Sequence, residues 1–175
     1  MTGADMELKT ERLVITCFTA DMARSVYEDS RDEDTRRFVP DEVFGSEDEA
    51  AETVRFLMSR YDGNEGPFVY PVLLRDGNES IGYVQLVPAG EGAWETGYHI
   101  AKRHTGNGYA TEAVNAFLPV ICARLGIKEV YGIALKENAA SVRVLRKCGF
   151  ETLYTGPGEY QGETRCIVKM IRRMD

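Results

Sequence analysis

Residues 103–110 read Arg103-His104-Thr105-Gly106-Asn107-Gly108-Tyr109-Ala110 and stand between a strand-like run, Trp94–Ala101, and a helix-like run. Glycine lets the backbone approach a ligand closely. The first N–H groups of a helix have no partner inside the helix, and the helix dipole is positive at that end. Several donors therefore converge where a phosphate group can bind. The segment predicts an anion-binding turn.

The two glycines alone are weak evidence, because an ordinary strand-to-helix turn also needs glycine for its geometry. The turn is not a Walker A loop, since no Gly-Lys-Ser/Thr sequence follows it. It is not a dinucleotide-binding fingerprint either, because Thr111 stands where that motif needs its third glycine. The neighbouring segments must decide what the turn binds.

A second set of polar residues lies one predicted strand further along the chain: Asn138, Ser141 and the pair Gly149-Phe150. Asn138 is a favourable helix N-cap, which is its simplest role. Ser141 follows three residues later and therefore lies on the same side of the predicted helix. Both side chains are expected near the end of the strand Lys128–Leu135.

The length of 175 residues predicts a single domain over residues 1–175, with residues 1–6 as a disordered tail. The N-terminal segment lacks the basic and apolar regions of a signal peptide, and no apolar run is long enough to cross a membrane. The formal net charge of -7 argues against sequence-independent nucleic-acid binding. It favours cationic substrates such as amines, although plain solubility is the simpler explanation.

The cysteines and histidines indicate neither disulfides nor a metal site. The cysteines are widely spaced and form no Cys-x-x-Cys pair, and the histidines do not complete a metal-binding pattern. We therefore expect reduced thiols in a cytoplasmic protein and no bound metal. The residues concerned are Cys17, Cys122, Cys148, Cys166, His99 and His104.

Hydrophobic periodicity predicts the order strand, helix, helix, three strands, helix, strand, helix, two strands. The expected strands are Arg12–Thr19, Phe68–Arg75, Ile81–Pro88, Trp94–Ala101, Lys128–Leu135, Phe150–Thr155 and Arg165–Ile171. The expected helices are Ala20–Ser30, Ser46–Tyr61, Asn107–Leu125 and Asn138–Cys148. Ser46 and Glu49 suit a capping box, and Gly126 suits a helix end.

Together these segments resemble the GCN5-related N-acetyltransferase (GNAT) superfamily. Arg103-x-x-Gly106-x-Gly108, followed by Tyr109-Ala110-Thr111-Glu112-Ala113, is similar to the acetyl-CoA loop of that superfamily. The opening Thr10–Ile15 and the segment Asn138–Phe150 resemble its ribosomal-protein N-terminal acetyltransferase (RimJ/RimL-like) branch. The resemblance spans about residues 10–171.

The resemblance implies an α/β (α+β) fold. Its sheet would be mixed and mostly antiparallel, with six to seven strands and about four flanking helices. The fourth and fifth strands would splay into a V, and acetyl-CoA would lie in the V. The residues implied in cofactor binding are Tyr98, His99, Ile100, Arg103, His104, Thr105, Gly106, Asn107, Gly108, Tyr109, Ala110, Asn138 and Ser141.

The implied reaction is direct attack of a primary amine on the thioester in a ternary complex. Glu95 is the candidate base, although a solvated strand residue is an equally simple interpretation. His99 is a weaker candidate, for which a packing role is favoured. Leu145 stands where many members carry the tyrosine that protonates the thiolate, so Ser141 is the candidate substitute.

The acceptor region is less explicit in the sequence. The resemblance places the acceptor wall around Arg31–Arg37, where a solvated loop is the simpler interpretation for any single residue. A loop at Gly156–Gly162 is expected to close over the acceptor. Thr105 and Asn107 replace an aromatic and a basic residue common in the branch, so backbone N–H groups must carry more of the phosphate binding.

Several functions fit these observations. The leading hypothesis is an acetyl-CoA-dependent N-acetyltransferase whose acceptor is a protein N-terminus. Its acceptor could also be a small amine such as a polyamine, an antibiotic or an amino acid. A CoA-binding sensor without turnover and a nucleotide-binding domain are the alternatives from other classes. We expect a monomer or homodimer that has neither a nucleic acid nor a membrane as a partner.

Overall fold

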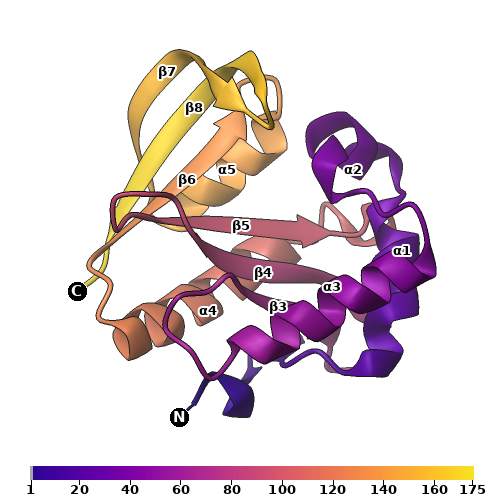
Figure 1. Cartoon of the computed structure of the whole chain (residues 1–175). Coiled ribbons are helices and arrows are strands. Elements are labelled where there is room, and N and C mark those ends of the chain that lie inside the picture. The colour runs from indigo at the N-terminus through magenta and orange to yellow at the C-terminus, as the bar shows by residue number, and fades with distance from the viewer. Residues whose placement is uncertain (1) are drawn as a thin grey trace.

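A computed structural model describes residues 2–175 and contains one eight-stranded mixed sheet flanked by helices (Figure 1). The sheet order is β1-β2-β3-β4-β5-β6-β8-β7, and only β5 and β6 pair in parallel. The strands are β1 (Glu7–Lys9), β2 (Leu13–Thr16), β3 (Phe68–Leu74), β4 (Ser80–Pro88), β5 (Trp94–Ile100), β6 (Glu129–Leu135), β7 (Glu151–Tyr160) and β8 (Glu163–Arg173). The helices are α1 (Ala23–Ser30), α2 (Glu33–Phe38), α3 (Glu47–Arg60), α4 (Tyr109–Leu125) and α5 (Ala139–Lys147). The predicted α/β class is confirmed.

Local capping explains where two of these helices begin and end. At α3, the Ser46 hydroxyl accepts a hydrogen bond from the N–H of Glu49 at 3.1 Å. The Glu49 carboxylate accepts one in turn from the N–H of Gly45 at 2.8 Å, one residue before the position that a capping box predicts. At the end of α4, Gly126 adopts the left-handed conformation with φ 68°.

Helix α4 forms the centre of the core on one face of the sheet. Its apolar residues at three- and four-residue spacing are fully or almost fully buried, as the periodicity predicts. Phe117 packs against Tyr70 of β3 with ring centroids 5.6 Å apart. The buried α4 side chains are Ala113, Val114, Phe117, Leu118, Ile121 and Cys122.

Strands β5 and β6 separate soon after they meet, as the resemblance implies. They pair only at Glu95 with Tyr131 and at Thr96 with Gly132. Beyond Thr96, residues 97–100 have no strand partner on the side of β6. In Figure 1, β6, β7 and β8 rise away from β5 as a separate wing of the sheet. The splay therefore exposes a strand edge in the middle of the molecule.

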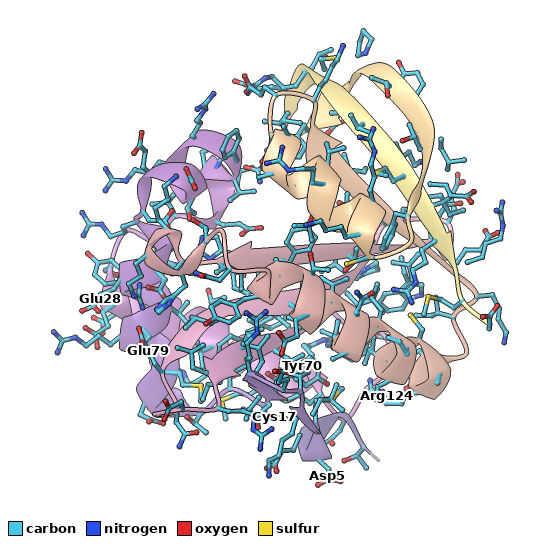
Figure 2. All side chains as sticks on the ribbon, turned by 180° about the vertical axis from the view of Figure 1, so that it is seen from behind. Asp5, Cys17, Glu28, Tyr70, Glu79 and Arg124 are labelled. Carbon is cyan, nitrogen blue, oxygen red and sulfur yellow. The ribbon has the colours of Figure 1, made fainter. Side chains whose placement is uncertain are left out.

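The N-terminal segment differs from the predicted disordered tail. Gly3–Asp5 form a 3₁₀ turn, and Met6 is buried with 2% exposure. The carbonyl of Gly3 accepts hydrogen bonds from the Tyr70 hydroxyl at 3.1 Å and from the Cys17 thiol at 3.3 Å. Figure 2 shows Asp5, Cys17 and Tyr70 at the same end of the molecule. These partners are distant in sequence, which is why local composition did not indicate them.

Two further elements were not expected. Strand β1 is three residues long and pairs only with β2. Helix α2 occupies residues that were interpreted as a loop, and Asp32 caps it by accepting from the N–H of Thr35 at 2.8 Å. Both elements are too short to carry a recognisable hydrophobic period.

The predicted loop Gly156–Gly162 is mostly strand. Strand β7 continues to Tyr160 and pairs with β8 throughout, including Gly158 opposite Arg165. A Cβ atom on Gly158 would lie 2.4 Å from the Ile167 side chain, so glycine permits close strand packing here. Only the turn at Gln161 and Gly162 remains as a loop.

The described residues also bear on the compartment and metal expectations. All four cysteines are free thiols. Within residues 2–175 no helix combines the length and hydrophobicity required to cross a bilayer. The same residues contain no group of three or more His, Cys, Asp or Glu side chains arranged to hold a metal ion.

Candidate active site

A cavity of about 820 Å³ lies where β5 and β6 splay apart. It is lined by β5, by the turn that leads into α4, by α5, by α2 with the segment after it, and by the tip of the β7–β8 hairpin. It brings together all the predicted site residues except Arg103 and Asn107. The predicted residues in its wall are Glu95, Tyr98, His99, Ile100, His104, Thr105, Gly106, Gly108, Tyr109, Ala110, Asn138 and Ser141.

The turn before α4 presents a row of unused donors to this cavity. Among residues 2–175, no acceptor bonds the six backbone N–H groups from Gly106 to Thr111. Gly106 and Gly108 both have positive φ angles, 81° and 80°. A Cβ on Gly106 would meet nothing within 4 Å, so the space above the turn is open. Unpaired N–H groups at a helix start, facing an open cavity, fit a phosphate.

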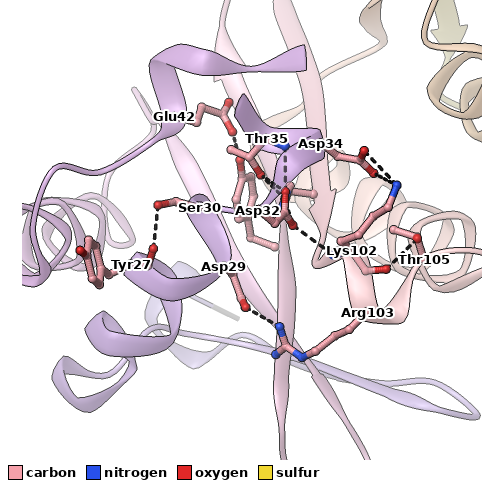
Figure 3. Close-up of polar contacts among 12 residues, drawn as sticks. Tyr27, Asp29, Ser30, Asp32, Asp34, Thr35, Glu42, Lys102, Arg103 and Thr105 are labelled. Atoms are coloured by element: carbon pink, nitrogen blue, oxygen red, sulfur yellow. Dashed lines mark hydrogen bonds and ion pairs between the residues drawn. The ribbon is translucent and has the colours of Figure 1, made fainter. Parts of the chain in front are cut away.

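The cationic side chains of this turn are already paired with carboxylates. Lys102 Nζ lies 2.9 Å from Asp34, and Arg103 Nη1 lies 2.6 Å from Asp29 (Figure 3). Arg103 also pairs with Glu79 at 3.1 Å. The Arg103 guanidinium is thus directed away from the cavity, unlike the expectation that it binds the cofactor. The carboxylates cancel most of the charge that the side chains would offer to a phosphate.

Asn107, the second predicted residue outside the cavity, has a local role. Its side-chain amide donates to the carbonyl of His104 at 3.1 Å and to that of Thr105 at 3.3 Å. Its own carbonyl accepts from Arg12 Nη1 at 2.8 Å. Asn107 therefore shapes the turn and leaves phosphate binding to the neighbouring N–H groups.

Glu112 turns away from the anion site. Its carboxylate accepts from the Thr10 hydroxyl at 2.6 Å and from Arg12 Nε at 2.7 Å. Burial alone would raise the pKa of Glu112, but the hydrogen bonds from Thr10 and Arg12 lower it overall. The carboxylate stays charged and pairs with Arg12, which lies in the turn between β1 and β2.

On α5, the polar pair predicted from the sequence forms a cap and a bridge. Asn138 Oδ1 accepts from the N–H of Ser141 at 3.2 Å, as expected for an N-cap. The Ser141 hydroxyl lies 2.9 Å from the Tyr98 hydroxyl, which also lies 2.9 Å from the Ser141 carbonyl. Burial raises the pKa of Tyr98 strongly, so its phenol remains protonated. Tyr98 therefore connects β5 to α5 across the cleft.

The side chains of successive residues in β5 point to opposite faces of the sheet. Tyr98 reaches α5 on one face, whereas the next residue, His99, reaches α2 on the other. Glu95 lies four residues before His99, so its side chain points to the same face of the sheet as His99 and to the face opposite Tyr98. The cavity runs between the separated strands β5 and β6. One of its ends lies beside the turn that leads into α4, and the other lies beside α2. Two reactants could enter it from different faces.

His99 is held in a polar cluster that attaches α2 to the sheet. Its Nε2 lies 2.7 Å from the Thr35 hydroxyl and 3.6 Å from Asp32. Asp32 also accepts from the N–H of Lys102 at 3.0 Å (Figure 3). Although burial opposes it, hydrogen bonding from Thr35 and Lys102 lowers the pKa of Asp32. This geometry gives His99 a positioning role rather than that of a free base.

Glu95 is partly buried in the cavity wall. Burial raises the pKa of its carboxyl, and the charge of Lys169 on β8 only partly opposes the effect. A carboxylate with a raised pKa is a stronger base than one in water. Glu95 thus combines accessibility to the cavity with the basicity that proton abstraction needs.

Three residues in the cavity wall, Glu42, Tyr83 and Arg143, were not singled out from the sequence. Glu42 belongs to a short 3₁₀ turn, Pro40–Glu42 (η3), that follows α2, and it accepts a hydrogen bond from Tyr83 of β4. Arg143 lies on α5, whereas Tyr160, at the tip of the β7–β8 hairpin, belongs to the segment Gly156–Gly162 that is expected from the sequence to close over the acceptor. These residues come from elements far apart in the chain, and no motif links them.

The hairpin tip and η3 meet over the cavity. Gln161 Oε1 accepts from the N–H of Asp41 at 3.0 Å. Burial raises the pKa of Tyr160 to about 12, and the nearby charges of Glu42 and Glu95 act in the same direction. The hairpin therefore covers the end of the cavity that contains both carboxylates.

The comparisons with known proteins agree with this geometry. A family model described as the acetyltransferase (GNAT) domain matches residues 12–151. The N-acetyltransferase YnaD of Bacillus subtilis strain 168 is 30% identical over 145 residues, which cover 82% of this chain and 82% of the relative.

Solved structures share the whole fold. A GNAT-family acetyltransferase from Bacillus anthracis superimposes with a TM-score of 0.81 at 24% identity, over 96% of this chain and 98% of that one. The ribosomal L7/L12 alpha-N-protein acetyltransferase RimL, solved with coenzyme A, gives a TM-score of 0.81 at 16% identity, over 97% and 98%. With its family model, its relative and its splayed sheet in agreement, the chain belongs to the GNAT acetyltransferase family.

Proposed function

We propose that this protein transfers the acetyl group of acetyl-CoA to a primary amine by direct attack in a ternary complex. The observation that carries the proposal is the row of six unpaired N–H groups, Gly106 to Thr111, at the end of a cavity with a basic carboxylate further inside. Acetyl-CoA supplies the activated acetyl group as a thioester. GNAT acetyltransferases use this donor, and the turn fits its diphosphate.

The residues of the chain have separate roles in this proposal. Glu95 takes the proton of the acceptor amine, directly or through water. Unpaired N–H groups on the β5 edge at residues 97–100 stabilise the oxygen on which negative charge develops. The Ser141 hydroxyl, held by Tyr98, donates a hydrogen bond toward the departing sulfur. A serine hydroxyl is a weak acid, so this donation need not amount to full proton transfer.

We propose a protein N-terminus as the acceptor. The support is the resemblance of residues 10–15 and 138–150 to the ribosomal-protein branch, together with the shared fold of a ribosomal-protein acetyltransferase. Glu42 and Glu95 line the end of the cavity beside α2, under the tip of the β7–β8 hairpin. Small amines remain the second candidate, favoured by the two carboxylates at that end.

A panel of amines tests the proposal. Release of free CoA thiol is measured with N-terminal peptides, polyamines, aminoglycosides and amino acids as acceptors. Turnover with peptides above that with the other classes is the expected result. Tight CoA binding without thiol release for any acceptor would support a sensor instead, and stabilisation by ATP but not by CoA would support a nucleotide-binding domain.

Two arginines near the cavity should differ in their effect on acetyl-CoA affinity. Arg143 lines the cavity and is exposed, and among residues 2–175 it forms no ion pair. Arg103 is neutralised by Asp29 and Glu79. We expect Arg143→Ala to weaken binding about three- to tenfold, because a free guanidinium can pair with phosphate. Arg103→Ala should change it less than about twofold. Calorimetric titration with CoA measures both, and the reverse order would contradict the assignment.

A further inference from the structure

Glu42 is an enclosed carboxylate without a cationic partner. Among residues 2–175, no lysine, arginine or histidine forms an ion pair with it, and its hydrogen-bond donor is the Tyr83 phenol. Burial raises the pKa of Glu42, and the Tyr83 hydrogen bond and the nearby His99 offset this only in part. A carboxylate that is partly removed from water is stabilised by a partner, so an unpaired one facing a cavity is a place for a cation.

The surroundings of Glu42 hold it in place. The Tyr83 ring stacks on His99 with centroids 5.6 Å apart, and His99 is fixed by Thr35. The N–H of Asp41, the preceding residue, donates to Gln161 of the hairpin. The carboxylate is therefore attached to the sheet, to α2 and to the hairpin. Such preorganisation favours binding of a ligand group over rearrangement.

The charges at this end of the cavity are mainly negative. Glu42, Glu95 and Glu159 line it, and Tyr160 lies close enough to Glu42 and Glu95 to feel both charges. On the cationic side, Arg37 is exposed and its guanidinium lies over the Phe38 ring, whereas Lys102 is paired with Asp34. Lys169 acts on Glu95 from β8, but within residues 2–175 none of these cations forms an ion pair with Glu42.

The two partly buried carboxylates, Glu42 and Glu95, need not bind the same nitrogen. In the proposed reaction Glu95 takes the proton of the reacting amine, so that nitrogen is committed to Glu95 and to the acetyl carbon. A second ammonium group on the acceptor stays charged in the ground state and in the transition state, and its pairing with Glu42 would raise kcat/KM. Glu42 is suited to a second cationic group on the acceptor.

We infer that Glu42, held by Tyr83, binds a second cationic group of the acceptor, so that dications are preferred over monocations. The inference rests on the proposed function, since it concerns the acceptor of that reaction. Such a cation is present in an α,ω-diamine, and equally in a peptide that carries lysine directly after its N-terminal residue. The shared chemistry is an ammonium group a few bonds from the reacting amine.

Matched acceptors test the inference by kinetics. The ratio of kcat/KM is measured for 1,5-diaminopentane against pentylamine, and for Ser-Lys-Ala-Ala against Ser-Ala-Ala-Ala. We expect the wild-type protein to prefer the dication of at least one pair by about tenfold or more, and Glu42→Gln to reduce that preference below about threefold. The pair that shows the effect identifies the source of the cation. Equal rates within both pairs, or a preference that survives in Glu42→Gln, would overturn the inference.

Two further variants separate local from general effects. Asp41→Asn removes the neighbouring charge, which does not line the cavity, and should retain the preference. Tyr83→Phe removes the phenol that donates to Glu42 but keeps the ring on His99, and should raise KM for the dication with little change in kcat. An equal loss of preference in Asp41→Asn would indicate a long-range electrostatic effect and would contradict a binding role of Glu42.

A binding measurement distinguishes failure of the inference from failure of the proposed function. Diamine and monoamine are titrated calorimetrically into the protein saturated with CoA, which carries no acetyl group and allows no turnover. Tighter binding of the diamine that disappears in Glu42→Gln supports the inference even if no acetyl transfer is found. Equal binding of both amines contradicts it, whatever the activity.

Discussion

Gly108→Val should weaken acetyl-CoA binding at least tenfold. Gly108 stands directly before α4 within the row of unpaired N–H groups, and its φ is 80°. A valine there would hold its Cβ 3.5 Å from Arg12 Nη2 and would be strained at this φ, so the turn would shift and its N–H groups would no longer converge on the diphosphate. Since the cations of the turn are paired with carboxylates, few other contacts could compensate. Calorimetric titration with acetyl-CoA measures the effect.

Gly77→Val is the matched control for this substitution. Gly77 lies in the β3–β4 turn with φ 85°, and a Cβ there would meet no atom within 4 Å. The Gly77→Val substitution therefore imposes a similar backbone strain at a distance from the cavity. Its thermal stability should fall, but its acetyl-CoA affinity should stay normal. Normal affinity in a folded Gly108→Val protein would show that the diphosphate binds elsewhere.

Glu95→Gln should lower kcat by roughly 10²–10³-fold, within the usual range for loss of a general base. The amide preserves the shape of the side chain but cannot accept the proton of the amine. Because acetyl-CoA binding depends on the turn before α4, its affinity should change little. Steady-state kinetics with an acceptor from the amine panel, together with CoA titration, separate these two effects.

The pH profile gives a second readout for Glu95. Burial raises its pKa, so kcat/KM should rise with pH as the carboxylate forms, above the ordinary range for glutamate of about 4. The groups facing it include Lys169, which opposes the shift, and Tyr160. In Glu95→Gln this acid limb should disappear.

The matched control for Glu95 is Glu129→Gln. Glu129 lies on β6 outside the cavity and forms an exposed pair with Arg173 at 3.5 Å. Its substitution should leave both kcat and the pH profile unchanged. An acid limb that persists in Glu95→Gln would assign the base to another group.

Much of the fold could be predicted from local patterns in the sequence. The three- and four-residue spacing of apolar residues in α4 predicted which face of the helix is buried, because a single apolar stripe can pack on a sheet in only one orientation. The caps at Ser46 and Asn138 were predicted because the side chain and the N–H that it binds lie three residues apart. Short elements such as β1 and α2 escaped prediction, since their stability comes from partners distant in the chain.

The anion-binding turn was determined almost entirely by the sequence. Its glycines, its place after a strand and its place before a helix are local features, and local geometry creates the unpaired N–H groups. The sequence also indicated that Thr105 and Asn107 shift the binding toward the backbone. Sequence alone did not reveal that Arg103 forms ion pairs with Asp29 and Glu79. These partners are 74 and 24 residues away along the chain, so the pairs depend on how the elements pack.

The acceptor end was decided by the tertiary structure. Glu42, Tyr83, Glu95 and Tyr160 come from four segments, and nothing in the spacing of these residues along the chain indicates that they meet. Their pKa shifts arise from burial, which exists only after η3 and the β7–β8 hairpin close over the splayed strands. The sequence therefore determined, through local backbone geometry, the turn that we propose to hold the acetyl donor. Only the packing of distant segments, which removes water from two carboxylates, decided where an acceptor can bind.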